Sequence, residues 1–323
     1  RKTGKSLLLY AIPLLAGLAI THTFIPPTPG PVAVAEVLNV NLGWVILTGA
    51  LVGLPTLVVC GIWFGRYISK KIHITAPQLT ETKEETHHNL PPIGLILMII
   101  ITPIALILLS TFMNSGILNM EGLSIGYRRF SFDLASLVTL TGHPFTALII
   151  ANLMAWYLLG KRQGLSKEQL FEITTRSMAP AGTIILLTGA GGVFKQVLVD
   201  TAAGEMIASL LTQTGMPIIV FAFLVASLIR IIQGSATVAM LTAAGIVSPL
   251  LDNDLGQFAT SCIAIAIASG ASVLSHVNDS GFWLVGQYLD MTEKQTASSW
   301  TVMTTLLAFC GFLSSWLLMS LFA

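Results

Sequence analysis

Long stretches without a charged side chain alternate with short polar segments along the whole chain. A helix that crosses the hydrocarbon core of a membrane needs about 20 mostly apolar residues, and most of the uncharged stretches reach that length. The pattern therefore predicts an all-α, polytopic membrane protein. The membrane-spanning segments that it predicts are 6–25, 43–65, 93–113, 133–159, 179–198, 217–251, 257–287 and 298–321.

Three of these segments are irregular. Segment 6–25 runs into a stretch with four prolines in six positions, 217–251 is too long for one ordinary crossing and is interrupted at 234–237, and 257–287 is interrupted at 275–281. A broken helix inside a membrane is tolerated only where protein or a wet cavity satisfies the freed backbone groups. Many transporters build their substrate sites from such breaks. We therefore predict a re-entrant hairpin over 217–251 and a discontinuous helix over 257–287.

Composition supports the membrane class. The chain is 54% hydrophobic and only 10% charged, whereas soluble domains carry about 25% charged residues. Water-soluble, disordered and fibrous classes are excluded, and barrel strands would be shorter and would alternate in hydrophobicity. The net charge of +1 without a basic patch argues against a nucleic-acid partner. The three cysteines show no metal-binding or disulfide spacing.

Lys and Arg orient the segments. They are frequent at the start of the chain, in 66–92 and in 160–176, whereas 26–42 contains none and 114–132 contains two. Because basic loops stay in the cytoplasm, the three basic regions are predicted to be cytoplasmic and the other two external. The polar stretch 66–92 is predicted to be a solvated linker between two membrane halves.

Arg230 is the most informative single residue, because 24 uncharged residues precede it. A guanidinium at this depth costs several kcal/mol unless it is paired or hydrated, so it marks a candidate functional site. Its planar fork suits a carboxylate. The small and hydroxyl residues Gly234, Ser235 and Thr237 follow at once, and a helix beginning near Thr237 would direct free N–H groups at an anion. The alternatives are a structural ion pair with Asp279, an arginine that reaches the membrane interface, and a seam of small residues that packs helices together.

A second polar cluster consists of His276, Asn278 and Asp279, and Asp279 is the first acid after 24 uncharged residues. A buried Asp or His whose pKa is shifted can exchange its proton in the physiological range. Asn278 and Ser275 are candidate donors to substrate hydroxyls. The alternative is a helix end at the interface, with His276 and Asp279 as caps.

His22 ends the apolar segment before the prolines. Prolines lack N–H donors and leave upstream carbonyls exposed, so this region is a candidate partner of the second cluster; the alternative is an external turn. The pair Thr21-His22 and the pair Ser275-His276 each end an apolar run and open a helix-breaking segment. The two pairs are predicted to lie in oppositely oriented segments, as an inverted repeat requires.

Four motifs stand in order along the chain: Thr21–Pro31, Gly191–Asp200, Arg230 with Gly234–Ala239, and Ser275–Trp283. Together they resemble the gluconate permease family of proton symporters. The resemblance implies proton-driven uptake of gluconate or a related small hydroxy acid across the bacterial inner membrane, with no cofactor. Idonate, other sugar acids and D-serine are alternative substrates within the family.

The family resembles a wider superfamily with two inverted repeats, each holding a re-entrant hairpin and a broken helix. Relatives have further membrane segments before the position of Arg1, so the resemblance implies a first repeat that is incomplete here, through truncation or through loss of half the site. The expected layout is 1–65 as the remainder of the first repeat, 66–92 as the cytoplasmic linker, and 93–323 as the second repeat with hairpin 217–251 and broken helix 257–287.

The residues and the resemblance together predict a secondary transporter whose partners are a small carboxylate and the lipid bilayer, with a homo-oligomer possible. A membrane-embedded hydrolase and an anion channel are the alternatives from other classes. Arg230 is expected to hold the carboxylate, and Asp279 or His276 to carry the coupling proton. The other residues expected at the substrate are Gly234, Ser235, Thr237, Asn278, His22 and Thr23.

Overall fold

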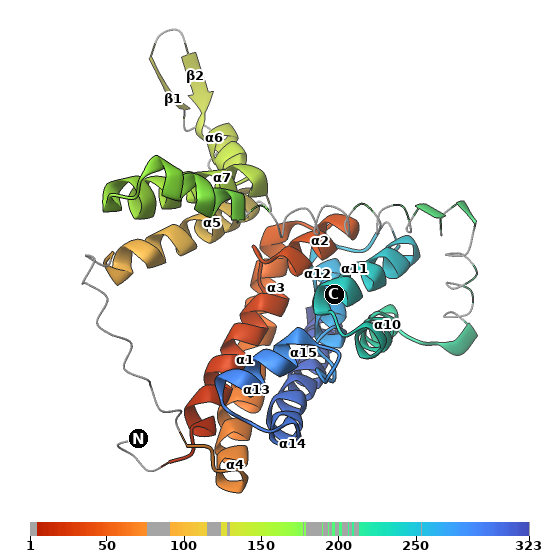
Figure 1. Cartoon of the computed structure of the whole chain (residues 1–323). Coiled ribbons are helices and arrows are strands. Elements are labelled where there is room, and N and C mark those ends of the chain that lie inside the picture. The colour runs from red at the N-terminus through yellow and green to blue at the C-terminus, as the bar shows by residue number, and fades with distance from the viewer. Residues whose placement is uncertain are drawn as a thin grey trace. The chain divides into compact units, whose positions relative to one another are not determined.

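The computed structural model describes residues 5–75, 91–114, 124–127, 130–176, 213–252 and 254–322, with isolated positions between 177 and 212. The chain divides into two compact units, one of Arg1–Leu79 with Ile185–Ala323 and the other of Thr80–Ile184 (Figure 1). The predicted segment 179–198 and the motif Gly191–Asp200 lie outside the continuously described residues.

Within the described residues, five helical stretches are long and apolar enough to cross a membrane. This finding confirms the prediction of a polytopic helical membrane protein. The five stretches are Leu8–Val37, Leu42–Lys71, Ile93–Met113, Pro144–Gln163 and Glu293–Phe322.

The first unit begins with a helix that is interrupted at the prolines. Helix α1 (Leu8–Phe24) stops there, and α2 (Pro29–Val37) begins with proline in its first turn, where a missing N–H costs nothing. The next helix is continuous and reaches beyond the predicted segment 43–65 into 66–92. It consists of α3 (Leu42–Thr56), the π-helical turn η1 (Leu57–Trp63) and α4 (Phe64–Lys71), and α3 contacts α1.

The predicted hairpin 217–251 consists of two short helices that contact each other. They are α10 (Ile218–Gln233) and α11 (Ala236–Val247), followed by the 3-10 turn η4 (Ser248–Leu250). The interruption covers Gly234 and Ser235 rather than 234–237, because the Ser235 hydroxyl caps α11 and accepts a hydrogen bond from the Val238 N–H at 3.4 Å.

The predicted discontinuous helix 257–287 consists of α12 (Gln257–Gly270) and α13 (Ser280–Tyr288). The break spans 271–279, so it starts earlier than the predicted 275–281. Every residue from Ala259 to Gly270 is buried, and α12 contacts α1, α2, α3, α10, α11 and α15. Helix α12 is therefore the centre of this unit's core. The last helix comprises α14 (Glu293–Thr296), the π-helical turn η5 (Ala297–Thr301) and α15 (Val302–Phe322).

In the second unit, α5 (Ile93–Asn114) contacts α6 (Leu134–Thr141) and α7 (Pro144–Ala155), and α7 continues into η2 (Trp156–Gly160) and η3 (Lys161–Gln163). The prediction of one uninterrupted segment over 133–159 is wrong: the helix breaks at Gly142 and His143, where Pro144 starts a new helix. A short antiparallel hairpin of β1 (Ser124–Tyr127) and β2 (Phe130–Asp133), with Ser124 opposite Asp133, precedes α6. Among the described elements of this unit, this hairpin is the part that does not fit the prediction of an all-α chain.

Candidate functional site

Four parts of the first unit surround one cavity of about 550 Å³, which we call the central cavity. They are the end of α1, the tip between α10 and α11, the break between α12 and α13, and the region where η5 joins α15. The structure thus brings the two predicted polar clusters and the proline-flanked end of α1 together. The predicted residues that line the cavity are His22, Thr23, Arg230, Gly234, Ser235, Thr237, Asn278 and Asp279.

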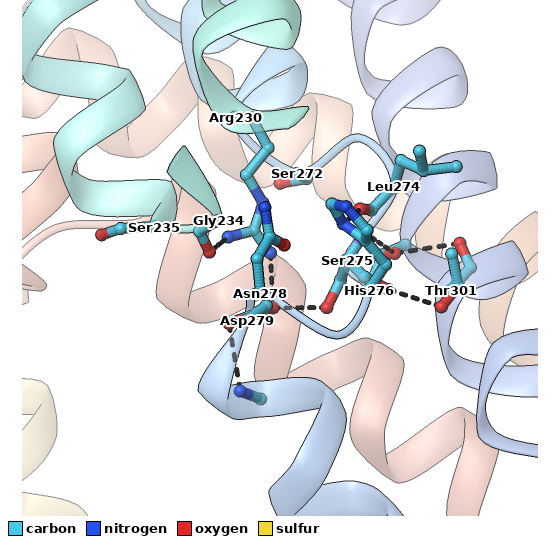
Figure 2. Close-up of polar contacts among 12 residues, drawn as sticks. Arg230, Gly234, Ser235, Ser272, Leu274, Ser275, His276, Asn278, Asp279 and Thr301 are labelled. Atoms are coloured by element: carbon cyan, nitrogen blue, oxygen red, sulfur yellow. Dashed lines mark hydrogen bonds and ion pairs between the residues drawn. The ribbon is translucent and has the colours of Figure 1, made fainter. Parts of the chain in front are cut away.

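Arg230 lies in the last turn of α10 and is only 4% exposed. Its Nη2 donates to Asp279 Oδ2 at 2.5 Å, and its Nη1 donates to the Gly234 carbonyl (Figure 2). The buried Nε has no hydrogen-bond partner among the described residues. Arg230 therefore forms the ion pair named above as an alternative, and this pair faces the cavity.

The Asp279 carboxylate is held from three directions. Oδ2 accepts hydrogen bonds from Arg230 and from the Ser275 hydroxyl, and Oδ1 accepts one from the Gly281 N–H at 3.0 Å. The contact to Gly281 makes Asp279 the N-cap of α13. Because one carboxylate both starts α13 and neutralises Arg230, the charge balance of the cavity is linked to the geometry of the helix break.

Behind Asp279, Ser275 connects the break to η5. The Trp300 indole N–H donates to the Ser275 hydroxyl at 2.7 Å. The Thr301 hydroxyl donates to the Ser275 carbonyl (Figure 2). Ser275 is 1% exposed. Its hydroxyl contacts Asp279 and Trp300, and Ser275 is not among the residues that line the central cavity. That it donates to a substrate stays a prediction.

Gly234 and Asn278 bring the two chain breaks into direct contact. Gly234 has a φ of 77°, and a Cβ at this position would lie 2.3 Å from the Asn278 carbonyl oxygen. The Asn278 side-chain amide also donates to the Ile231 carbonyl at 3.0 Å. Only glycine fits both the backbone conformation and the close approach, which accounts for its position at the tip.

Ser235 and Thr237 bring the N-terminus of α11 to the cavity, since both line it together with Ala236. Helix α11 begins at Ala236, which confirms the predicted helix start near Thr237. The first N–H groups of a helix and its dipole favour an anion. This end of the cavity therefore has two independent sources of positive potential, the start of α11 and Arg230.

The two histidines differ in position. His22 is exposed and lines the cavity, next to Thr23, whose hydroxyl donates to the Ala19 carbonyl at 2.7 Å. His276 is not among the lining residues; its Nδ1 lies 2.9 Å from the Leu274 carbonyl oxygen. Geometry thus separates His276 from Asp279, although both were candidates for the same role.

Sequence reasoning missed the contribution of the last helix. Trp300 and Thr304 line the cavity, and so do Gln233 and Ser272. The available signal was the run of hydroxyl residues at Ser298, Ser299, Thr301, Thr304 and Thr305 at the start of an otherwise apolar segment. The remaining wall is apolar and comes from Leu15, Leu18, Leu284 and Leu307, among others.

The model of the family described as GntP family permease matches residues 1–322. The chain belongs to the GntP permease family. It is therefore a membrane transporter and not an enzyme, which excludes the hydrolase alternative.

Individual relatives support the assignment. The chain is 39% identical to the low-affinity gluconate transporter of Escherichia coli K12, with 96% of this chain and 68% of that protein covered. It is 38% identical to a gluconate permease of Pseudomonas aeruginosa, with 96% and 67% covered. It is 33% identical to the inner membrane permease YgbN of Escherichia coli K12, with 96% and 68% covered.

Proposed function

We propose that this transporter carries a small hydroxylated carboxylate such as gluconate across the inner membrane together with a proton. The observation that carries the proposal is the Arg230–Asp279 pair on the wall of a cavity between interrupted helices. A volume of about 550 Å³ suits a small organic molecule. Similar proteins are named gluconate transporters or permeases, and a sugar acid combines the carboxylate and hydroxyl groups that the lining side chains complement.

The substrate carboxylate competes with Asp279 for Arg230 in this proposal. Asp279 occupies Nη2 alone, and the neighbouring Nε is buried without a partner among the described residues. Nε and Nη2 point the same way and form the edge that binds a carboxylate through two parallel hydrogen bonds. An incoming carboxylate satisfies both nitrogens and displaces Asp279 from Nη2.

Charge balance then explains why a proton accompanies the substrate. The described residues that line the central cavity include one Arg, Arg230, and one Asp, Asp279, but no Lys or Glu. Their opposite charges cancel, so the pair is neutral when the cavity is empty. An anion alone would leave one uncompensated negative charge in apolar surroundings, which is costly. A proton on the displaced Asp279 restores neutrality, so the loaded cavity crosses the membrane without net charge.

The hydroxyl groups of the substrate are assigned to the other polar lining residues. Asn278, Ser235 and Thr237 provide amide and hydroxyl groups near Arg230, while His22 and Thr23 lie on α1. Gly234 contributes backbone at the closest approach of the two breaks. These residues select the substrate, whereas Arg230 anchors it.

The two interrupted helices also support an inverted-repeat architecture. The break between α1 and α2 and the break between α12 and α13 lie in one unit, and residues beside both line the same cavity. We assign α10–α11 as the re-entrant hairpin of the second repeat, within 93–323, and α1–α2 as the broken helix of the first, within 1–65. The part of 66–92 that follows the end of α4 at Lys71 is then assigned as the cytoplasmic linker.

Counterflow in proteoliposomes tests the function. Vesicles loaded with unlabelled gluconate should transiently accumulate labelled gluconate, which a channel does not do. Arg230→Lys keeps the charge but loses the two-bond edge, and we expect at least a tenfold lower transport rate. Arg176→Gln is the matched control, because Arg176 pairs with Glu172 on an exposed helix and should leave transport unchanged. Absence of counterflow in the unmodified protein, or an unaffected Arg230→Lys variant, would overturn the proposal.

A further inference from the structure

A second cavity of about 790 Å³ lies at the other end of α1, where the start of α1 meets η1 and α4. We call it the basic cavity. Its basic lining residues are Lys5, Arg66, Lys70 and His73, and the lining residues include no Asp or Glu. A site of one charge sign between two membrane-length helices suggests an anionic ligand.

Two of the basic side chains share one face of α4. Arg66, Ser69 and Lys70 line the basic cavity, and their spacing of three and four residues places them on the same side of the helix. His73 also lines the cavity and follows the end of α4 at Lys71. Lys71, the next residue after Lys70, does not line it; its Nζ lies 4.5 Å from the centre of the Tyr67 ring. The cavity is therefore lined by a selected set of the basic residues at this end of the helix.

The two sides of the basic cavity are fixed to each other by backbone contacts around Ser6. The Ser6 hydroxyl donates to the Ile72 carbonyl at 2.8 Å and accepts from the Ile74 N–H at 3.1 Å, and the Leu7 N–H donates to the Ile74 carbonyl at 2.9 Å. Ser6 is 4% exposed. These contacts hold the segment with Lys5 against the segment with His73. The fold therefore keeps these basic residues close to one another.

The remaining wall is apolar. Leu9, Tyr10 and Pro13 from α1 and Ile62 from η1 line the basic cavity together with the charged residues. Tyr10 is 53% exposed, and Leu14 on the next part of α1 is 65% exposed. A ligand that fits this arrangement has an anionic head and an apolar body that continues along the helices.

We propose that the basic cavity binds the headgroup of an anionic phospholipid, with the phosphate at Arg66, Lys70 and Lys5 and the acyl chains along Leu9, Pro13 and Ile62. The charge complementarity and the adjoining apolar wall select a lipid over a free anion. Basic residues at this end also place it on the cytoplasmic side, where anionic lipids attract them. The site is independent of substrate transport and of the central cavity.

Titration with spin-labelled phosphatidylglycerol and spin-labelled phosphatidylcholine, on the purified protein in neutral detergent, tests this proposal. We expect a clear preference for phosphatidylglycerol. Lys70→Gln and Arg66→Gln should each weaken phosphatidylglycerol binding about fivefold, and Lys70→Arg should retain it. Lys71→Gln removes the same charge one position away and should change the affinity less than twofold.

Three outcomes would overturn the proposal. Equal affinity for the two lipids would show that the headgroup charge is not recognised. A loss with Lys71→Gln as large as with Lys70→Gln would show that only the general surface charge acts. Displacement of the lipid by millimolar inorganic phosphate would show that the basic groups take a free anion. Counterflow by each variant confirms that the variant is folded. If the unmodified protein shows no counterflow, the proposed function fails, but the lipid-binding result remains valid.

Discussion

At the scale of single residues, Arg230 and Asp279 are informative because each is expensive to bury alone. Removing one partner of a buried ion pair costs about 3–5 kcal/mol, so both must remain together unless another charge replaces one of them. The sequence revealed both residues, since each interrupts a long uncharged run. It did not reveal that the Ser275 hydroxyl donates to Asp279, because sequence spacing alone does not show which partner a serine hydroxyl binds.

Ser275→Ala should lower the free energy of unfolding by about 1–3 kcal/mol, because it removes a donor to Asp279 and leaves the Trp300 N–H without its acceptor. Chemical denaturation in detergent, followed by tryptophan fluorescence, measures the change. Ser298→Ala is the control: Ser298 is exposed and bonds only to the Lys294 carbonyl among the described contacts, so its effect should stay within about 0.5 kcal/mol. Equal effects of the two substitutions would contradict the assigned role of Ser275.

At the scale of elements, runs of uncharged residues predicted where helices lie. They predicted less well where those helices are interrupted. The ends of α1 and α5 match the predicted 6–25 and 93–113 within a few residues, because hydrophobic length dominates there. The break within 133–159 was missed since Gly142, His143 and Pro144 carry no charge. The last helix starts before 298 because Thr292 and Gln295 form a capping box that extends it through charged residues. Local capping chemistry thus sets ends that hydropathy cannot resolve.

The tip between α10 and α11 offers a test of close packing between elements. Gly234→Ala places a Cβ 2.3 Å from the Asn278 carbonyl oxygen, so it should separate the two breaks and reduce counterflow at least tenfold. Gly164→Ala is the matched control: Gly164 has a φ of 84° but nothing lies within 4 Å of an added Cβ. The control should cost about 1 kcal/mol of stability from its backbone conformation alone and keep full transport. Wild-type counterflow by Gly234→Ala would show that the close approach is not needed.

At the scale of the whole molecule, the site is a product of tertiary structure. The cavity joins residues near 22, 230, 279 and 300, and no local pattern in the sequence states that these segments meet. The resemblance to a transporter family supplied the expectation, and α12 explains it physically, because this helix, buried from Ala259 to Gly270, contacts α1, α10 and α15. The sequence did not predict that the last helix lines the site, because each of its hydroxyl residues is also compatible with ordinary helix packing.

Coupling of the proton to the substrate is a property of the entire transport cycle, and Asp279→Asn separates it from binding. Asparagine still caps α13 but does not take up a proton, so the variant should keep gluconate exchange while losing accumulation driven by a pH gradient. The measurement compares counterflow at equal pH with uptake into vesicles that carry an imposed gradient. His276→Ala is the control, because His276 lies outside the cavity lining, and it should retain both activities. If Asp279→Asn still accumulates gluconate at the wild-type level under a pH gradient, Asp279 does not carry the coupling proton. That result would not affect the assignment of the substrate-binding residues.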